Sequence, residues 1–111
     1  MNSSSKYLLY YTTKAGESPF IKWFESLDHA VEQVVRSRLE RVKNGNCDDY
    51  KSLGDGVFEL RIHFGAGYRI YYGIDGVNVI LLLCGGDKST QIKDIKRAKS
   101  FLEAYKNENR K

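Results

Sequence analysis

Two stretches in the first half of the chain space their hydrophobic residues as a helix does. Ser18 followed by Pro19 is typical of a helix N-cap and the first helical position. Asp28 can cap a second helix, which we expect to end near Gly45. The apolar stripes are Phe20, Trp23, Phe24 and Leu27 in the first helix and Val31, Val34, Val35, Leu39 and Val42 in the second. Two helices with single apolar faces need a sheet to pack against.

The middle of the chain changes to the period of two that is typical of strands. Hydrophobic and polar residues alternate over residues 58–64, and a turn at residues 65–67 leads into a returning strand at residues 68–73. The Asp75-Gly76 pair is a strong signal for a type I′ turn. It precedes residues 77–84 (VNVILLLC), which are apolar on both faces, so we expect that strand to be covered on both sides.

The two ends of the chain complete the predicted fold. Residues 6–13 are rich in aromatic and β-preferring residues and predict a strand, whereas a last helix is expected to start near Ser89. The apolar stripe of that helix consists of Ile92, Ile95, Ala98, Leu102 and Tyr105. The order β-α-α-β-β-β-α predicts an α+β fold with two N-terminal helices packed on an antiparallel sheet. The length of 111 residues indicates a single domain spanning residues 1–111.

The lengths of the two turns predict which residues lie opposite one another in the sheet. A three-residue loop puts Arg61 opposite Tyr71 and a two-residue turn puts Tyr71 opposite Ile80. The core side then carries Phe58, Leu60, Ile62, Phe64, Tyr68, Ile70 and Tyr72. The other side carries the polar residues Glu59, Arg61, His63, Arg69 and Tyr71 beside an apolar patch of Ile80 and Leu82. We expect the last helix or a partner protein to cover that patch.

The polar side of this predicted sheet suits a phosphate-bearing ligand. Arg61 and Arg69 offer guanidinium groups for bidentate contacts with phosphate oxygens, and His63 can exchange a proton near neutral pH. Tyr71 can stack on a base, and Lys88 lies at the approach to a helix N-terminus that favours anions. These are the groups needed for RNA cleavage without a metal ion, in which the 2′-hydroxyl attacks the adjacent phosphorus and cations stabilise the developing charge.

An ordinary solvated ladder is the alternative interpretation of the same residues, with Glu59 pairing Arg61 or a neighbouring cation. In either case both arginines face away from the predicted core. Replacing Arg61 or Arg69 with alanine is therefore expected to impair activity and to leave folding intact.

The positive charge is concentrated near the C-terminal end. The formal net charge is +4, and residues 88–111 carry eight Lys and Arg against three Asp and Glu, so that the remainder is nearly neutral. The basic residues on the polar side of the last helix are Lys93, Lys96, Arg97, Lys99 and Lys106. This surface suits a nucleic acid or an acidic protein partner, although a solvated helix face has a similar composition.

Other features exclude several classes of protein. There is no apolar run of 18 residues that could span a membrane, and residues 1–6 (MNSSSK) lack the apolar core of a signal peptide, so a cytoplasmic protein is expected. Cys47 and Cys84 have no metal-ligand spacing and are expected to be free thiols in a reducing compartment. Neither a metal nor a cofactor is expected.

Several short motifs, taken together in their order, resemble the RelE/ParE superfamily of bacterial toxins. They are Glu59-Leu60-Arg61, Gly67-Tyr68-Arg69-Ile70-Tyr71 and Gly85-Gly86-Asp87-Lys88-Ser89, followed by Gln91, Asp94-Ile95 and Ala98. The resemblance extends over essentially the whole chain and is sharpest over residues 54–105. The most similar branch is the HigB-like group, often called addiction module killer protein.

This resemblance implies the toxin of a type II toxin-antitoxin module, silenced by a cognate antitoxin that is a helix-turn-helix protein encoded beside it. It implies an endoribonuclease that cleaves mRNA, usually on the ribosome, and needs no metal or cofactor. The catalytic candidates are Arg61 and Arg69, which match the phosphate-contacting arginines of the family, Lys88, which matches a basic position, and His63, added from its position on the sheet. The RNA-binding candidates are Tyr71, Asp87, Lys51, Lys93, Lys96 and Arg97.

The chain departs from the RelE pattern in two places. RelE-type members have several lysines before the second strand, where the nearest lysines of this chain are Lys43 and Lys51. They also have a tyrosine near the C-terminus, whereas Tyr105 of this chain falls on an apolar stripe. The general acid and base are therefore unassigned, with His63 as the best local candidate. Two other functions share the predicted fold: a ParE-like inhibitor that binds DNA gyrase, and a degenerate protein that only binds the antitoxin.

Overall fold

The computed structural model describes residues 5–47 and 49–109, and these form one mixed sheet with helices on both faces. Four strands are antiparallel neighbours, and the N-terminal strand pairs in parallel at one edge, giving the order β1-β5-β4-β3-β2. The elements are β1 (Tyr7–Tyr10), α1 (Pro19–Glu25), α2 (His29–Lys43), β2 (Tyr50–Ser52), β3 (Phe58–Ile62), β4 (Tyr68–Asp75), β5 (Val79–Asp87), the 3-10 turn η1 (Lys88–Thr90) and α3 (Gln91–Glu108). The predicted α+β class is confirmed, with β2 as an additional strand that the pattern did not indicate.

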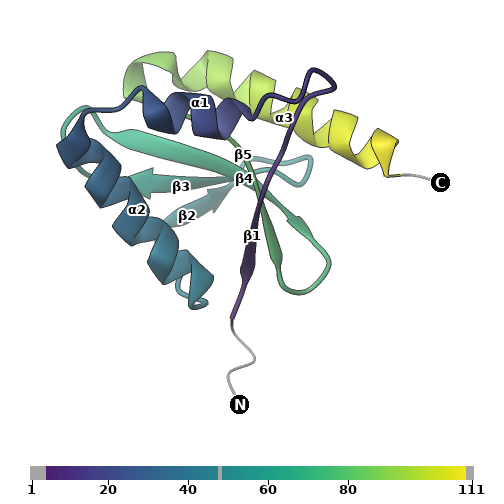
Figure 1. Ribbon diagram of the computed structural model, residues 1–111, viewed down its shortest axis with the longest axis horizontal. Coiled ribbons are helices and arrows are strands. Elements are labelled where there is room, and N and C mark those ends of the chain that lie inside the picture. The colour runs from purple at the N-terminus through teal and green to yellow at the C-terminus, as the bar shows by residue number, and fades with distance from the viewer. Residues whose placement is uncertain (1–4, 48, 110–111) are drawn as a thin grey trace.

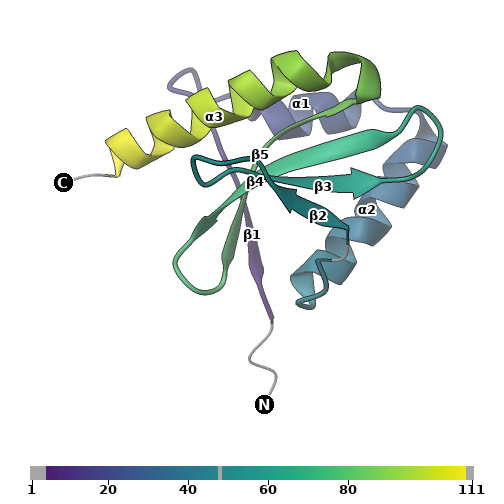
Figure 2. The same ribbon diagram turned by 180° about the vertical axis from the view of Figure 1, so that it is seen from behind.

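The first two helices lie on one face of the sheet and α3 lies on the other (Figures 1 and 2). The predicted start of α1 is confirmed, because Ser18 Oγ accepts a hydrogen bond from the Ile21 amide at 3.2 Å and Pro19 occupies the first turn. The predicted end of α2 is also confirmed, since Gly45 has a φ of +89° that favours glycine. Within the described ranges, no helix is both long and apolar enough to cross a membrane.

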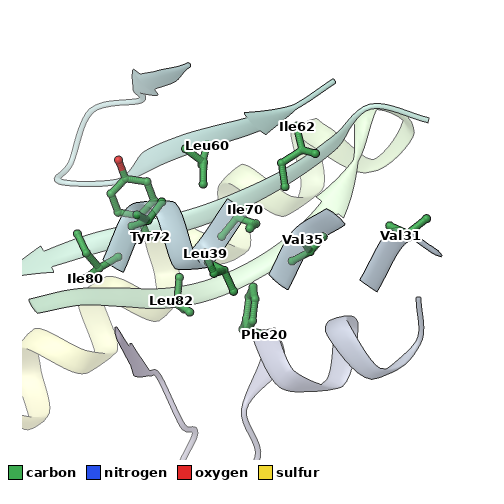
Figure 3. Close-up of a cluster of buried hydrophobic side chains, with 11 residues drawn as sticks. Phe20, Val31, Val35, Leu39, Leu60, Ile62, Ile70, Tyr72, Ile80 and Leu82 are labelled. Carbon is green, nitrogen blue, oxygen red and sulfur yellow. The ribbon is translucent and has the colours of Figure 1, made fainter. Parts of the chain in front are cut away.

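The first core fills the space between the sheet and the helices α1 and α2 (Figure 3). Its buried members are Phe20, Val31, Val35, Leu39, Val42, Leu60, Ile62, Ile70, Tyr72, Ile80 and Leu82. Phe58 and Tyr68 pack against this cluster, whereas Phe64 lies outside it in an exposed loop. The core side predicted for β3 and β4 is thus confirmed for every residue except Phe64.

A second core lies beneath α3 on the opposite face. Its buried members are Tyr11, Val57, Tyr71, Leu81, Leu83, Cys84, Ala98 and Leu102. Because β5 contributes to both cores, the prediction that both of its faces are covered is confirmed. The expectation that the last helix covers the second face is confirmed as well, so this face is largely a packed interface.

The pairing between strands differs from the prediction in both hairpins. Arg61 lies opposite Arg69 and not Tyr71, because the loop between β3 and β4 contains five residues and not three. This change of two positions leaves every side chain on its predicted face. In the second hairpin Asp75 pairs with Val79, which makes the turn three residues long. The register of β5 against residues 72–75 of β4 therefore differs from the prediction by an odd number of residues, which exchanges the two faces of the strand. Ile80 and Leu82 lie in the first core, and Leu81 and Leu83 lie in the second. The predicted patch of Ile80 and Leu82 on the polar side is wrong.

The α3 stripe differs from its prediction at its first turn. Ile92 is 78% exposed, whereas the carboxylate of Asp94 is buried. The Thr90 hydroxyl donates a 2.5 Å hydrogen bond to Asp94 Oδ2, and Arg97 Nη1 lies 3.4 Å from the other carboxylate oxygen. Gly86 makes room for this carboxylate, since a Cβ at that position would overlap Asp94 Oδ2.

Candidate functional site

Two arginines meet on the α3 side of the sheet, as the alternation of β3 predicted. Arg61 and Arg69 are direct partners in the β3–β4 ladder, and Cβ atoms of such pairs are about 5 Å apart. Two adjacent guanidinium groups repel each other unless acceptors lie between or beside them. Each arginine pairs with a different carboxylate, Arg69 with Glu59 and Arg61 with Asp49.

Arg69 is held firmly within the protein. Its side chain is only 13% exposed, and its Nε lies 3.4 Å from Oε2 of Glu59, whose side chain is 2% exposed. Nη1 of Arg69 donates a hydrogen bond of 2.9 Å to the carbonyl of Gly67. Gln91, the first residue of α3, donates a 2.7 Å hydrogen bond to the same Oε2 of Glu59. Of the two pairings that the solvated-ladder interpretation allowed for Glu59, the structure has the one with a neighbouring cation, Arg69, and not the one with Arg61.

Arg61 has a looser environment at the open end of the same face. Its side chain is 40% exposed, and its Nη2 donates a 3.1 Å hydrogen bond to Oδ1 of Asp49. His63, which is 77% exposed, contacts Asp49 Oδ2 through Nε2. Asp49 lies in the left-handed region with a φ of +59°, a conformation that aspartate tolerates better than most residues. Asp49 thus joins two of the predicted catalytic residues.

The Asp49 carboxylate is ionised in this arrangement. Burial acts to raise the pKa of Asp49, but the hydrogen bond with His63 and the charge of Arg61 outweigh it and hold the pKa below its ordinary value. If Nε2 of His63 carries the proton that Asp49 accepts, then Nδ1 of a neutral imidazole presents its lone pair to solvent. The contact with Asp49 thereby orients the imidazole of His63 next to Arg61.

The lowered pKa of Asp49 predicts a pH dependence of folding stability. A carboxylate whose pKa is lower in the folded than in the unfolded chain stabilises the fold above the unfolded value, about 3.9 for aspartate. This contribution is lost as the pH falls through the folded value. We expect wild type to exceed Asp49→Asn in melting temperature at pH 6, and the difference to fade below pH ~4. A difference that stays constant down to pH 2 would show that the charge of Asp49 contributes nothing; circular dichroism melts of both proteins measure it.

Lys88 lies beside the arginine pair at the end of β5. A Cβ built on Gly67 would lie 3.5 Å from Nη1 of Arg69 and 3.9 Å from Cβ of Lys88, so both residues flank the same turn. The preceding residue, Asp87, uses its carboxylate to cap η1, accepting from the amide and the hydroxyl of Ser89 at 2.8 and 2.6 Å. The hydrogen bonds from Ser89 lower the pKa of Asp87. Asp87 therefore fixes the turn that carries Lys88.

Tyr71 does not lie at the surface, and the prediction that it stacks on an RNA base is wrong. Its side chain is fully buried in the second core, because α3 covers this part of the sheet. Its hydroxyl has no hydrogen-bond partner in the described part of the chain. Burial, and then the charge of Glu59, raises the pKa of Tyr71 well above its ordinary value. The tyrosine is a core residue next to the site.

The remaining RNA-binding candidates are exposed but do not converge on one point. Lys51 lies on β2 directly opposite Glu59, at the sheet edge next to Arg61. Lys93, Lys96 and Arg97 line a surface hollow together with Lys88 along η1 and the first turns of α3. Arg97 is partly engaged already, since it pairs with Asp94 and lies 5.4 Å over the ring of Phe101. The basic residues of η1 and α3 therefore form a positive surface that extends away from the arginine pair.

The described part of the chain offers no metal site, and its thiols are not activated as nucleophiles. Residues 5–47 and 49–109 contain no group of three His, Cys, Asp or Glu side chains placed to bind a metal ion. Cys47 and Cys84 are free thiols, and burial raises the pKa of Cys84 to about 12, which keeps it protonated at neutral pH. Tyr105, predicted only as part of the apolar stripe of α3, donates a 2.5 Å hydrogen bond to Asp75 and lies away from the arginines on α3.

Most of the chain matches a known protein family and a protein from another organism. Residues 22–106 match the model of a family described as "Phage derived protein Gp49-like (DUF891)". A protein of Haemophilus influenzae (strain Rd), described as uncharacterized, is 47% identical over 85 residues, which is 76% of this chain and 86% of that protein. The region matched by the family model includes the residues that make up the site: Asp49, Glu59, Arg61, His63, Arg69, Lys88 and Gln91.

Proposed function

Because the chain belongs to the Gp49-like family, a toxin-like family of the RelE/HigB addiction-module type, we propose that it is a toxin that cleaves mRNA and is silenced by an antitoxin. The observation that carries this proposal is the pair of adjacent arginines at a sheet face left partly open beside α3. A protein that acted only by binding would not need two neighbouring guanidinium groups with separate carboxylate partners.

The proposed reaction uses the ribose 2′-hydroxyl as nucleophile. The 2′-oxygen forms a bond to the adjacent phosphorus while the bond from phosphorus to the 5′-oxygen breaks, which yields a 2′,3′-cyclic phosphate and a 5′-hydroxyl. Arg61, Arg69 and Lys88 would stabilise the charge on the phosphorane. His63, oriented by Asp49, would accept the 2′-hydroxyl proton at Nδ1, and a proton from solvent would complete the leaving 5′-hydroxyl.

The surroundings of the arginine pair supply RNA contacts in this proposal. Lys51 lies at the β2 edge, and Lys88, Lys93 and Lys96 extend the positive surface along η1 and α3. Each lysine that contacts a phosphate would add a salt-dependent increment to affinity without sequence preference. A positive surface of this length therefore favours a long polyanion over a mononucleotide as the ligand.

Expression of Arg61→Ala tests the proposal, since this arginine is the more exposed of the two. Induced wild type should arrest growth and produce new transcript 5′ ends, whereas Arg61→Ala should lose about a hundredfold in cleavage rate of purified RNA. Arg36→Ala, on the opposite face in α2 and paired there with Glu32, is the matched control and should behave as wild type.

Three results would contradict ribonuclease action by this site. Growth arrest with intact transcripts and an SOS response would indicate gyrase inhibition, and antitoxin binding without any arrest would indicate a degenerate toxin. Cleavage by Arg61→Ala at the wild-type rate would mean that the arginine pair is not the site. Detection of 2′,3′-cyclic phosphate ends in the products would support the proposed chemistry.

A further inference from the structure

Glu59 is a buried carboxylate that packing alone does not explain. Its side chain is 2% exposed, and burying a charge is costly unless it is paired. Replacing a buried ion pair with apolar residues is frequently neutral or stabilising, so a buried pair is weak evidence of a role in stability. The partners of Glu59 indicate what the charge does instead.

A single oxygen of Glu59 connects an arginine of the sheet with the first residue of α3. Oε2 lies 3.4 Å from Arg69 Nε and accepts the 2.7 Å hydrogen bond from Gln91 Nε2. Arg69 is the diagonal cross-strand neighbour of Glu59, a distance that long side chains can bridge. The side-chain amide of Gln91 donates to the same oxygen, so the position of α3 helps to determine where the carboxylate points.

The guanidinium of Arg69 is consequently fixed on two of its edges. Nε faces the Glu59 carboxylate in an ion pair at 3.4 Å without forming a hydrogen bond, and Nη1 donates a hydrogen bond of 2.9 Å to the Gly67 carbonyl. Nη2 has no acceptor within residues 5–47 and 49–109. A donor that is held in place before the ligand arrives loses little freedom on binding. Arg61 has a weaker support, because the carboxylate with which it pairs, Asp49, lies in a loop.

We propose that Glu59 is a positioning residue, which acts through Arg69 by holding the guanidinium with Nη2 free to meet a phosphate oxygen. Gln91 completes the support from α3. This inference rests on the function proposed above insofar as the ligand of Arg69 is an RNA phosphate. The orientation of the guanidinium itself does not depend on that function.

The first experiment reads the orientation of Arg69 directly by NMR of the arginine Nε–H groups in the whole chain. The Nε–H of Arg69 should be rigid and protected from solvent exchange in wild type. In Glu59→Gln, which keeps the shape and an acceptor for Gln91, it should become mobile and exchange at least tenfold faster. Glu40→Gln, the same change on an exposed residue of α2, is the matched control and should leave the signal unchanged. An unchanged Arg69 signal in Glu59→Gln would overturn the proposal, whether or not the protein cleaves RNA.

The second experiment is a double-mutant cycle on RNA cleavage. Glu59→Gln should lower kcat by about tenfold to a hundredfold with KM within about twofold, because a misplaced donor mainly weakens transition-state contacts. In an Arg69→Lys background, which keeps a cation beside Glu59, the same change should cost less than threefold. Equal losses in both backgrounds would show that Glu59 does not act through Arg69. Failure of wild type to cleave RNA would reject the proposed function alone, and the NMR result would still decide the role of Glu59.

Discussion

Replacing Arg69 with alanine is expected to abolish RNA cleavage and to destabilise the fold at the same time. Loss of a preorganised donor at the reacting phosphate costs about a hundredfold to a thousandfold in rate. The same change leaves the buried carboxylate of Glu59 without its cation, which costs about 3 kcal/mol for a buried pair. We therefore expect a melting temperature lower by about 10 °C or more, measured by calorimetry beside a cleavage assay.

A second substitution separates the two losses. Glu59→Gln in the Arg69→Ala background removes the uncompensated charge and keeps an acceptor for Gln91, so it should restore most of the melting temperature. Cleavage should stay absent, because the donor is still missing. If Arg69→Ala melts like wild type, the pair is not buried as described. From sequence, neither arginine was predicted to affect folding when replaced by alanine. We keep that prediction for Arg61, and the burial of Arg69 leads us to expect the opposite result there.

Replacing Gly86 with alanine is expected to loosen α3 from the sheet. The new Cβ would overlap Oδ2 of Asp94 and lie 2.9 Å from its Cγ and 2.8 Å from Thr90 Oγ1. Asp94 is buried and bonded to Thr90, so it cannot move aside without losing that bond. Overpacking of this kind costs about 1–3 kcal/mol, and displacing the start of α3 would also disturb Gln91. Both the melting temperature and the cleavage rate should fall.

Asp94→Ala supplies the control for this overlap. With the carboxylate removed, the methyl group of Gly86→Ala meets only the Thr90 hydroxyl, which no longer has Asp94 to hold it and can rotate away. The second change should then cost less than half of what it costs in wild type. Hydrogen exchange across α3 would locate the effect, with faster exchange expected in its first two turns. If Gly86→Ala costs the same in both backgrounds, the conflict lies in the backbone and not with Asp94.

Helix positions and strand faces were predictable because each depends on a local pattern. Ser18-Pro19 and Gly45 marked helix ends through cap geometry, and the strict alternation of residues 58–62 assigned Arg61 to its face. The register of β5 was not predictable, because Leu81 and Leu83 are as hydrophobic as Ile80 and Leu82 and either pair suits either core. The packing of helices on both faces of the sheet determines which of the two pairs of side chains enters which core.

The candidate site was predictable in its arginines and not in their partners. Arg61 and Arg69 could be placed on one face from periodicity, but Asp49 belongs to a short segment before β2, a strand of three residues with no usable pattern. Gln91 and the burial of Tyr71 depend on where α3 crosses the sheet. Periodicity placed Ile92 inward, whereas the space left by Gly86 accepts Asp94 instead. Which of these side chains is buried depends on tertiary packing, which the local sequence pattern does not show.

The two carboxylates at the arginine pair differ in whether a ligand could replace them. Asp49 lies in a loop beside the exposed Arg61, so an incoming phosphate could take its place and leave it in solvent. Glu59 is enclosed by the sheet and α3 and stays where it is. If the proposed function holds, binding at this site would exchange one anion for another, and a single small anion would gain little from it. A strand of RNA, whose further phosphates would reach Lys88 and the lysines of α3, would complete the exchange, so that Asp49 would select for polyanions over small anions.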